Sequence, residues 1–241
     1  MKKAVVTLNI GYDNITTFSH PTFKSYADKI GADFIVMDKK ICKNNYFCKF
    51  YVRELLEKYD RILFIDTDCF VMSNCPDLFD IVPEDSFGLY NEAADLATDV
   101  INYSAINHWM KKSIALYGFD IRWNIGITRS KEEWSPYYNT GVMVFGKQHK
   151  DLFVVPDKFY SMPGPGEQSY LNCIIFQTNT KVFELSHKFN RLTQMRTIKE
   201  PIFDSYIIHY ANYDGDTNLS ENRYKAMKKD YENFIINDQS R

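Results

Sequence analysis

The chain has 241 residues, a formal net charge of −2 and a sequence pI near 6.2. This length suits one α/β domain with a substantial core, and the near-neutral charge without a basic run argues against nucleic-acid binding. No apolar stretch is long enough to span a bilayer, and the five cysteines lack paired CxxC spacing, so we expect a reducing, cytoplasmic setting without a disulfide framework or a zinc site.

The first quarter of the chain alternates between strand and helix patterns. Residues 4–8 form an apolar strand with a polar, glycine-containing exit, and Pro21 is typical of the first turn of a helix that ends at Ile30. A second strand is predicted at 34–37, and an amphipathic helix at 47–59 precedes the next strand. This β-α-β-α-β order predicts a Rossmann-like half with parallel strands.

The third strand, 61–66, ends in two aspartates. The apolar run from Ile62 to Ile65 is typical of a strand buried on both faces, and Asp66 and Asp68 follow it. In extended backbone, residues i and i+2 point to the same side, so both carboxylates could face one ligand. Two hard oxygen donors suit Mg²⁺ or Mn²⁺, and the alternative interpretation is an ordinary turn at a strand end.

The remaining elements complete one α/β domain without an internal repeat. We predict a turn and a single helical turn within 74–79, strands at 87–90, 138–145, 182–185 and 206–209, and helices at 97–117, 167–176 and 220–236.

Several short motifs occur together in a characteristic order. They are Val5-Val6-Thr7-Leu8 with Tyr12, Phe64-Ile65-Asp66-Thr67-Asp68, Asn139-Thr140-Gly141-Val142-Met143-Val144-Phe145, Glu167-Gln168 with Leu171-Asn172, and Ile207-Ile208-His209-Tyr210. Together they resemble the glycogenin-like, family 8 members of the GT-A fold glycosyltransferases. The resemblance implies a single α/β domain over 1–241 with a mixed sheet flanked by helices, and an enzyme of hexosyltransferase type.

The resemblance also implies a metal site. In the family, the two aspartates of the DxD motif and a C-terminal histidine hold a divalent ion, which here corresponds to Asp66, Asp68 and His209. The ion would neutralise the departing diphosphate of a nucleotide-sugar donor. An imidazole among oxygen ligands favours Mn²⁺ over Mg²⁺. The alternative for His209 is a buried histidine that is satisfied within the core.

The resemblance also implies a donor site, built from residues within and between these motifs. It comprises Thr7, Asn9, Gly11, Tyr12, Asp38, Lys49, Asp66, Thr67, Asn139, Thr140 and Gly141. Tyr12 could stack on uracil and Gly11 would allow close backbone approach, whereas an ordinary strand-to-helix turn is the alternative. Asp38 could equally be a turn residue. Lys49 could be a solvated lysine on a helix, in which case Arg53 on the same face could serve instead.

Glu167 and Gln168 are the candidate catalytic residues. Family members usually have aspartate at the position of Glu167, near the reacting carbon of the sugar. The longer side chain could act as a general base, or could simply be an acid at a helix N-terminus. Family 8 enzymes retain configuration and other GT-A enzymes invert it, so one carboxylate leaves the stereochemical outcome open.

We expect residues 1–90 to form the donor half and 91–241 to form the acceptor half with the C-terminal metal-ligand strand. The expected partners are a nucleotide sugar, with UDP favoured, and a glycan, protein or small-molecule acceptor. Two alternatives remain at this point. One is a phosphatase of the haloacid-dehalogenase type, whose first Asp of Asp-x-Asp would be a nucleophile. The other is a nucleotide-sugar-binding domain without transfer activity.

Overall fold

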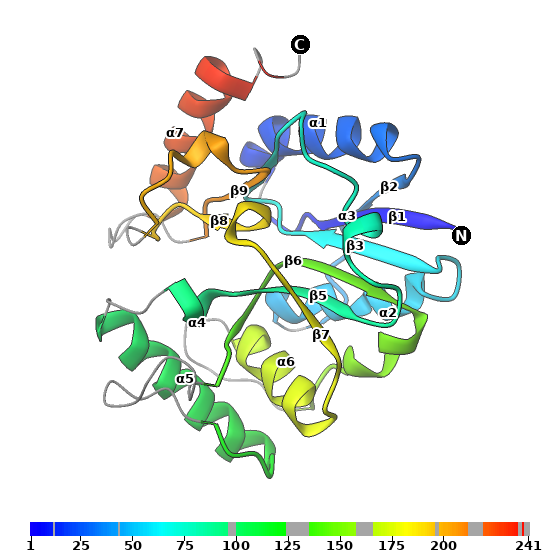
Figure 1. Ribbon diagram of the computed structural model, residues 1–241, viewed down its shortest axis with the longest axis vertical. Helices are drawn as coiled ribbons and strands as arrows, with labels where there is room; N and C mark the ends of the chain where they lie inside the picture. The colour runs from blue at the N-terminus through cyan, green and yellow to red at the C-terminus, as the bar shows by residue number, and fades with distance from the viewer. Residues whose placement is uncertain are drawn as a thin grey trace.

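A computed structural model describes residues 1–11, 13–42, 44–95, 100–123, 135–157, 166–195, 198–211, 219–235 and 238. Its centre is a six-stranded sheet with the order β2-β1-β3-β6-β5-β7 (Figure 1). The strands are β1 (Lys3–Leu8), β2 (Asp33–Met37), β3 (Arg61–Ile65), β5 (Phe87–Asn91), β6 (Tyr138–Gly146) and β7 (Val182–Leu185).

One strand of this sheet runs against the others. β1 pairs in parallel with β2 and β3, and β5 pairs in parallel with β7, whereas β6 is antiparallel to both β3 and β5. The sheet is therefore mixed, as predicted. The amino-terminal end of β6 consequently lies at the same sheet edge as the carboxyl ends of β1, β3 and β5.

The central strands are buried on both faces because helices and 3₁₀ segments cover the sheet on each side. Along β3, Leu63 packs toward Phe23 of α1 (Asp13–Lys29), and Phe64 packs toward Phe50 on the opposite face. All five residues of β3 are buried. This agrees with the continuous apolar run that identified the strand.

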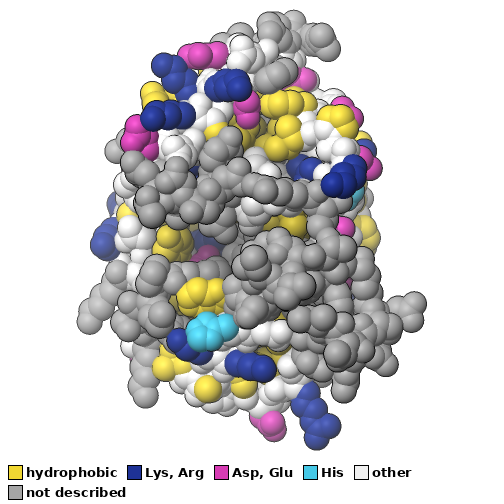
Figure 2. Space-filling view, turned by 90° about the vertical axis from the view of Figure 1, so that its left-hand side faces the viewer, with side chains coloured by type: hydrophobic (Ala, Val, Ile, Leu, Met, Phe, Trp, Pro, Cys, Tyr) yellow, Lys and Arg dark blue, Asp and Glu magenta, His cyan; other side chains and the backbone are white. Residues whose placement is uncertain are grey.

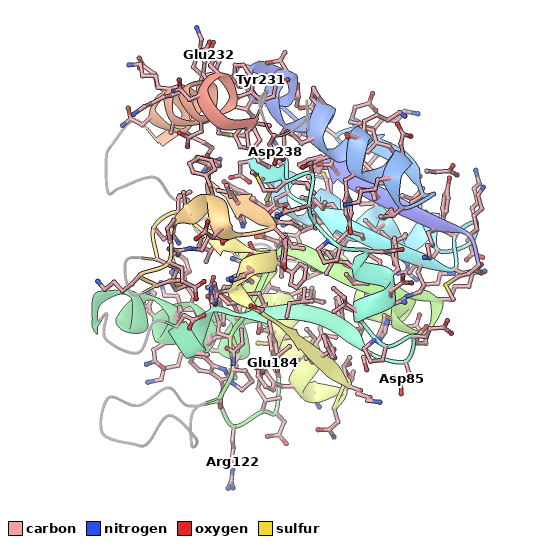
Figure 3. The ribbon with its side chains drawn as sticks, turned by 45° about the horizontal axis from the view of Figure 1, so that its top comes forward. Asp85, Arg122, Glu184, Tyr231, Glu232 and Asp238 are labelled. Atoms are coloured by element: carbon pink, nitrogen blue, oxygen red, sulfur yellow. The ribbon has the colours of Figure 1, made fainter. Side chains whose placement is uncertain are left out.

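A second, three-stranded sheet lies beside the end of β3. Its order is β4 (Cys69–Val71), β9 (Ile207–His209) and β8 (Arg191–Leu192), with β9 antiparallel to β4. The helix α7 (Leu219–Asp230) and the π-helical turn that follows it (Tyr231–Ile235) pack against α1. Tyr231, labelled in Figure 3, contacts the rings of Phe18 and Phe70. This small sheet attaches the C-terminal part of the chain to the turn that contains the two aspartates.

Three of the remaining helical elements agree with the sequence prediction, at Leu78–Ile81, Val100–Tyr117 and Gly166–Gln177. The remaining elements are η1 (Asn45–Tyr51), α2 (Val52–Leu55), α3 (Leu78–Ile81), α4 (Glu92–Asp95), α5 (Val100–Tyr117), η3 (Lys147–Leu152), α6 (Gly166–Gln177), η4 (His187–Phe189) and η5 (Ile202–Asp204).

Two helix predictions were wrong. The first helix starts at Asp13, so Pro21 lies inside it and not in its first turn. Pro21 removes one backbone hydrogen bond. The buried face of α1, which includes Phe23, Tyr26 and Ala27, offsets that loss. The predicted helix at 47–59 is instead a 3₁₀ helix followed by a single α-helical turn. Within the described residues, no helix is both long and apolar enough to cross a membrane.

Candidate active site

The candidate site lies where β1 and β3 end and β6 begins. The end of β3 and the start of β6 lie side by side. Ile65 pairs with Val142, and next to this pair the backbone N–H of Asp66 donates to the carbonyl of Gly141 at 2.7 Å. Figure 2 shows a hollow at mid-height on the left-hand side of Figure 1, with hydrophobic and acidic side chains visible within it. The sheet thus gathers the predicted motifs at one edge.

The two aspartates do not point the same way. Strand β3 ends at Ile65, and the N–H of Cys69 donates to the carbonyl of Asp66 at 3.2 Å, which closes a turn over 66–69. The expectation that extended backbone would place both carboxylates on one side was therefore wrong, since that rule holds only within a strand. Asp66 faces Lys49 instead, and Asp68 faces His209.

Asp68 and His209 form the centre of a buried charged cluster. Asp68 Oδ1 lies 3.3 Å from His209 Nε2, and Asp68 Oδ2 lies 3.0 Å from Nη1 of Arg223 on α7. Burial alone would raise the pKa of Asp68, but Arg223 and His209 outweigh burial and hold that pKa well below its usual range. The Cys69 sulfur also lies within 4.8 Å of the Asp68 and His209 ligand atoms.

These residues fit a divalent ion in part. Adjacent ligands of an octahedral ion bound at about 2.1 Å lie about 3 Å apart, which is close to the 3.3 Å between Asp68 and His209. Cys69 is the third potential ligand of this cluster, and Asp66 is not a member of it. The Asp66 carboxylate is 26% exposed and is held by Lys49. A rotation of that side chain would be needed to bring Asp66 to the same ion.

Lys49 links Asp66 with the candidate catalytic glutamate. Its ammonium lies 3.1 Å from Asp66 Oδ1 and 3.4 Å from Glu167 Oε1, and the lysine is 2% exposed. Burial would lower the pKa of Lys49, but the two carboxylates reverse this effect and raise it. The pKa of Glu167 is raised by burial, against the opposing effect of Lys49. The other carboxylate oxygen of Glu167 is buried and has no hydrogen-bond partner among the described residues.

A buried network of amides surrounds a carboxylate that the sequence analysis missed. Glu92 accepts hydrogen bonds from Asn139 Nδ2 at 2.9 Å and from Gln168 Nε2 at 3.0 Å. Gln168 Oε1 in turn accepts from the N–H of Thr140 at 3.2 Å. Burial raises the pKa of Glu92 to about 7, although its hydrogen bonds to the two amides act in the opposite direction. The predicted residues Asn139, Thr140 and Gln168 thus belong to one network.

Gly141 is required by its closeness to His209. A Cβ atom at this position would lie 2.2 Å from Cε1 and 2.7 Å from Nδ1 of the His209 ring. Only glycine therefore allows the start of β6 to lie against the imidazole.

The residues predicted to hold the nucleoside lie along the end of β1. Thr7 is buried, with its hydroxyl 3.4 Å from that of Thr67, which also donates to the carbonyl of Leu8. The N–H of Asn9 donates to Met37 at the end of β2 at 2.8 Å. Gly11 has a φ of +82°, which favours glycine.

The other two residues predicted to hold the nucleoside are Asp38 and Tyr12. Asp38 is exposed just after β2, close to the end of β1. Tyr12 lies outside the described residues.

Besides Cys69, three residues that contact the predicted ones were not predicted themselves: Glu92, Asn190, whose side-chain oxygen lies 2.8 Å from His209 Nδ1, and Arg223. Each reaches the site through contacts between elements that are far apart in the chain. Glu92 lies two residues after the predicted strand at 87–90. The carboxyl end of that strand was the available signal for Glu92.

The chain is similar to one known protein family and to several solved structures. The model of the family described as Glycosyl transferase family 8 matches residues 7–214. A search of curated proteins found no match. Among solved structures, a glycosyltransferase involved in the glycosylation of the major capsid of PBCV-1 is similar with a TM-score of 0.60 at 12% identity, over 95% of this chain and 100% of the other.

Two further glycosyltransferases are also similar in structure. The glycosyltransferase GlyE of Streptococcus pneumoniae TIGR4 has a TM-score of 0.56 at 14% identity, over 99% of this chain and 63% of the other. The galactosyltransferase LgtC, in complex with donor and acceptor sugar analogs, has a TM-score of 0.52 at 14% identity, over 94% of this chain and 95% of the other. At these identities the likeness concerns the fold.

Proposed function

The chain belongs to glycosyl transferase family 8 and is a glycosyltransferase with a GT-A fold, and we propose that it moves a hexosyl unit from a UDP-sugar to a hydroxyl acceptor with the help of a divalent metal ion. The observation that best supports this proposal is the buried pair of Asp68 and His209, 3.3 Å apart at the sheet edge where the donor motifs meet. A buried carboxylate and an imidazole nitrogen at this spacing are suited to bind one divalent ion, and Arg223 contacts only the other oxygen of Asp68.

The proposed ion is Mn²⁺ or Mg²⁺, and Asp68 and His209 would hold it, with Asp66 joining after it turns from Lys49. Such an ion supplies Lewis-acid stabilisation of the departing diphosphate. The imidazole nitrogen favours Mn²⁺.

The nucleoside would lie along the end of β1, with Thr7, Asn9, Gly11, Tyr12 and Asp38 around it. Gly11 offers backbone that a ligand can approach closely, and the exposed Asp38 could accept a hydrogen bond from the base imide.

Thr67 and the amide network would complete the donor site. Thr67 is fixed by its bond to Leu8 and so presents its backbone in a defined place. Asn139, Thr140 and Gly141 at the start of β6 would face the sugar side of the donor.

Glu167 and Gln168 would act closest to the reacting carbon. The unpartnered carboxylate oxygen of Glu167 is available to accept a proton, while Lys49 holds the other oxygen. Gln168 is held by Glu92 and is suited to contact sugar hydroxyls. We expect the acceptor to be a glycan, protein or small molecule bound by the 91–241 half, with residues 1–90 holding the donor, in a reducing, cytoplasmic setting.

Neither alternative function agrees with the family. A dehalogenase-type phosphatase would use Asp66 as a free nucleophile. Here Asp66 is ion-paired with a buried lysine. A binding domain without activity would be expected to lose the aspartates or the histidine, and Asp68 and His209 are both in place.

The test is thermal unfolding with Mn²⁺ plus UDP, Mn²⁺ plus GDP, or neither, on wild type and Asp68→Ala. A ligand at 100 times its Kd stabilises the native state by about 2.7 kcal/mol, which corresponds to roughly 5–10 °C for a chain of this size. We expect this rise with UDP and Mn²⁺ in wild type and in the surface variant Asp85→Ala, and not in Asp68→Ala. A rise with GDP alone would change the donor class. The absence of a shift with either nucleotide would refute the proposal.

A further inference from the structure

A chain of buried polar groups leads from Glu92 to the candidate metal ligand His209. Asn139 donates through Nδ2 to Glu92 at 2.9 Å, and its oxygen accepts from Nδ2 of Asn190 at 2.8 Å. The oxygen of Asn190 lies 2.8 Å from Nδ1 of His209. All four side chains are buried, with exposed fractions of 8% or less. Buried polar groups need hydrogen-bond partners, so each donor in this chain must meet an acceptor.

The direction of every hydrogen bond in this chain follows from one backbone group. The N–H of Gly141 approaches the side chain of Asn139 at 2.9 Å. A backbone N–H can only donate, so the Asn139 atom that faces it must be the amide oxygen. The same oxygen faces Asn190, which must therefore present its NH₂ group there. The Asn190 oxygen then points at His209 and can only accept.

His209 must therefore carry a proton on Nδ1. In the neutral ring the lone pair then lies on Nε2, which is 3.3 Å from the carboxylate oxygen of Asp68. With a neutral ring, two acceptors face each other at that distance, and a shared cation would stabilise the pair; with a charged ring, Nε2 donates to Asp68 directly. A metal-binding histidine commonly donates its other ring N–H to a fixed acceptor in this way.

We propose that Asn190, held by Asn139 and Glu92, is a positioning residue that keeps the proton on Nδ1 of His209 and so directs Nε2 at a divalent cation shared with Asp68. The cation is the one of the proposed function, and to that extent the inference rests on it. The location of the ring proton does not depend on any activity.

The hydrogen-bonded series Glu92, Asn139, Asn190 and His209 is called the relay below. Glu92 also connects the relay to the side-chain amide of Gln168. Its Oε2 orients Asn139, and its Oε1 accepts from Gln168, which turns the oxygen of Gln168 toward Thr140. One carboxylate thus sets the orientation of the amides on the metal side and on the sugar side. A glutamine at position 92 has only one oxygen, so it could satisfy only one of the two amides without a rearrangement.

The direct test is nitrogen NMR of protein labelled with ¹⁵N-histidine, without metal, from pH 7 to 9. The ring resonances of His209 are assigned by comparison with His209→Gln. We expect Nδ1 of His209 to be protonated throughout, whether the ring is neutral or charged. An unprotonated Nδ1 in the folded wild type would overturn the proposal.

Two variants of buried asparagines test whether Asn190 is responsible. Asn190→Leu removes the acceptor of the Nδ1 proton. Asn172→Leu is the matched control, because Asn172 is a fully buried amide bonded to the backbone of Tyr138 and of Gln168 and to none of the side chains of Glu92, Asn139, Asn190 and His209. We expect Asn190→Leu to lower Mn²⁺ affinity by about 10–100-fold, measured from free Mn²⁺ by electron paramagnetic resonance, and to reduce protonation of Nδ1. Equal effects of the two variants would contradict a positioning role.

Glu92→Gln extends the test if Asn190→Leu does not fold. It keeps the shape of the side chain, and we expect it to weaken Mn²⁺ binding and to change the Nδ1 resonance of His209. Unchanged Mn²⁺ binding and an unchanged resonance would overturn the relay. A protonated Nδ1 without Mn²⁺ binding would refute the proposed function while supporting the position of the proton, so the two failures can be distinguished.

Discussion

Gly141→Ala is the most informative single substitution, because it presses directly on His209. The added Cβ would lie 2.2 Å from Cε1 of the ring, against an ordinary carbon contact of about 3.5–4.0 Å. The ring cannot yield without loosening its 2.8 Å contact with Asn190 or its 3.3 Å contact with Asp68. Overpacking costs about 1–3 kcal/mol and a lost hydrogen bond about 1 kcal/mol, so we expect a destabilisation of about 2–4 kcal/mol.

The same substitution should also weaken metal binding. Displacement of a ligand or of its supporting hydrogen bond typically reduces metal affinity by about 10–100-fold. Urea unfolding without metal gives the stability change, and free Mn²⁺ measured by electron paramagnetic resonance gives the affinity.

Gly88→Ala is the matched control for this experiment. Its Cβ would lie 2.7 Å from a methyl group of Val82 and 3.1 Å from Cβ of Val144, so it overpacks the same sheet without approaching His209. We expect both variants to lose stability and only Gly141→Ala to lose Mn²⁺ affinity. If Gly141→Ala binds Mn²⁺ as wild type does, or if the two variants lose affinity equally, the reasoning about His209 is refuted.

Three further predictions concern the charges of the site. Lys49→Met should lower the free energy of unfolding by about 3 kcal/mol, because it leaves the carboxylates of Asp66 and Glu167 without their counter-charge. Lys24→Met, at an exposed lysine, should cost less than about 0.5 kcal/mol. Similar urea midpoints for the two variants would contradict this prediction. Arg223→Met should let the pKa of Asp68 rise toward its usual value, so the variant should be less stable than wild type at pH 7. This deficit should narrow below pH 4, where Asp68 of the variant becomes protonated while Asp68 of the wild type stays ionised to lower pH, and a deficit independent of pH would argue against the pairing. Burial raises the pKa of Glu92 from 4.5 to about 7, so between these values the folded protein keeps a proton that the unfolded chain has lost, and stability should fall with rising pH by up to about 1.4 kcal/mol per unit. Glu92→Gln should flatten that dependence in urea unfolding from pH 4.5 to 8, and parallel curves would show that Glu92 is not its cause.

The sheet could be predicted because its strands have strong local patterns. The apolar run of β3 and the uniformly buried β6 are continuous enough to be recognised without knowledge of their neighbours. The strands of the small sheet are harder to predict. β4 has three residues and β8 has two, and neither is long enough to show a period. Their pairing with β9 is what makes them strands.

The motif residues could be found from sequence, but their orientation could not. The turn after β3 sends Asp66 to Lys49 and Asp68 to His209, and that divergence depends on a backbone hydrogen bond from Cys69. Glu92 was missed for a related reason. A glutamate in a short helix is ordinary in isolation, and only its burial between Asn139 and Gln168 makes it unusual.

The reversed direction of β6 has a consequence for how this enzyme can diversify. Asn91 at the end of β5 is paired with Tyr138 at the start of β6, so the intervening segment leaves the sheet and returns to it at adjacent points. The segment carries α4 and α5, and α5 packs against α6. A stretch of flexible loop added within it leaves the register of the strands unchanged, and doubling the length of such a loop costs only about 0.6 kcal/mol in closure entropy. Both ends of the segment lie beside the candidate site. Insertions and deletions there can thus reshape the surface beside the candidate site while the strands stay in place.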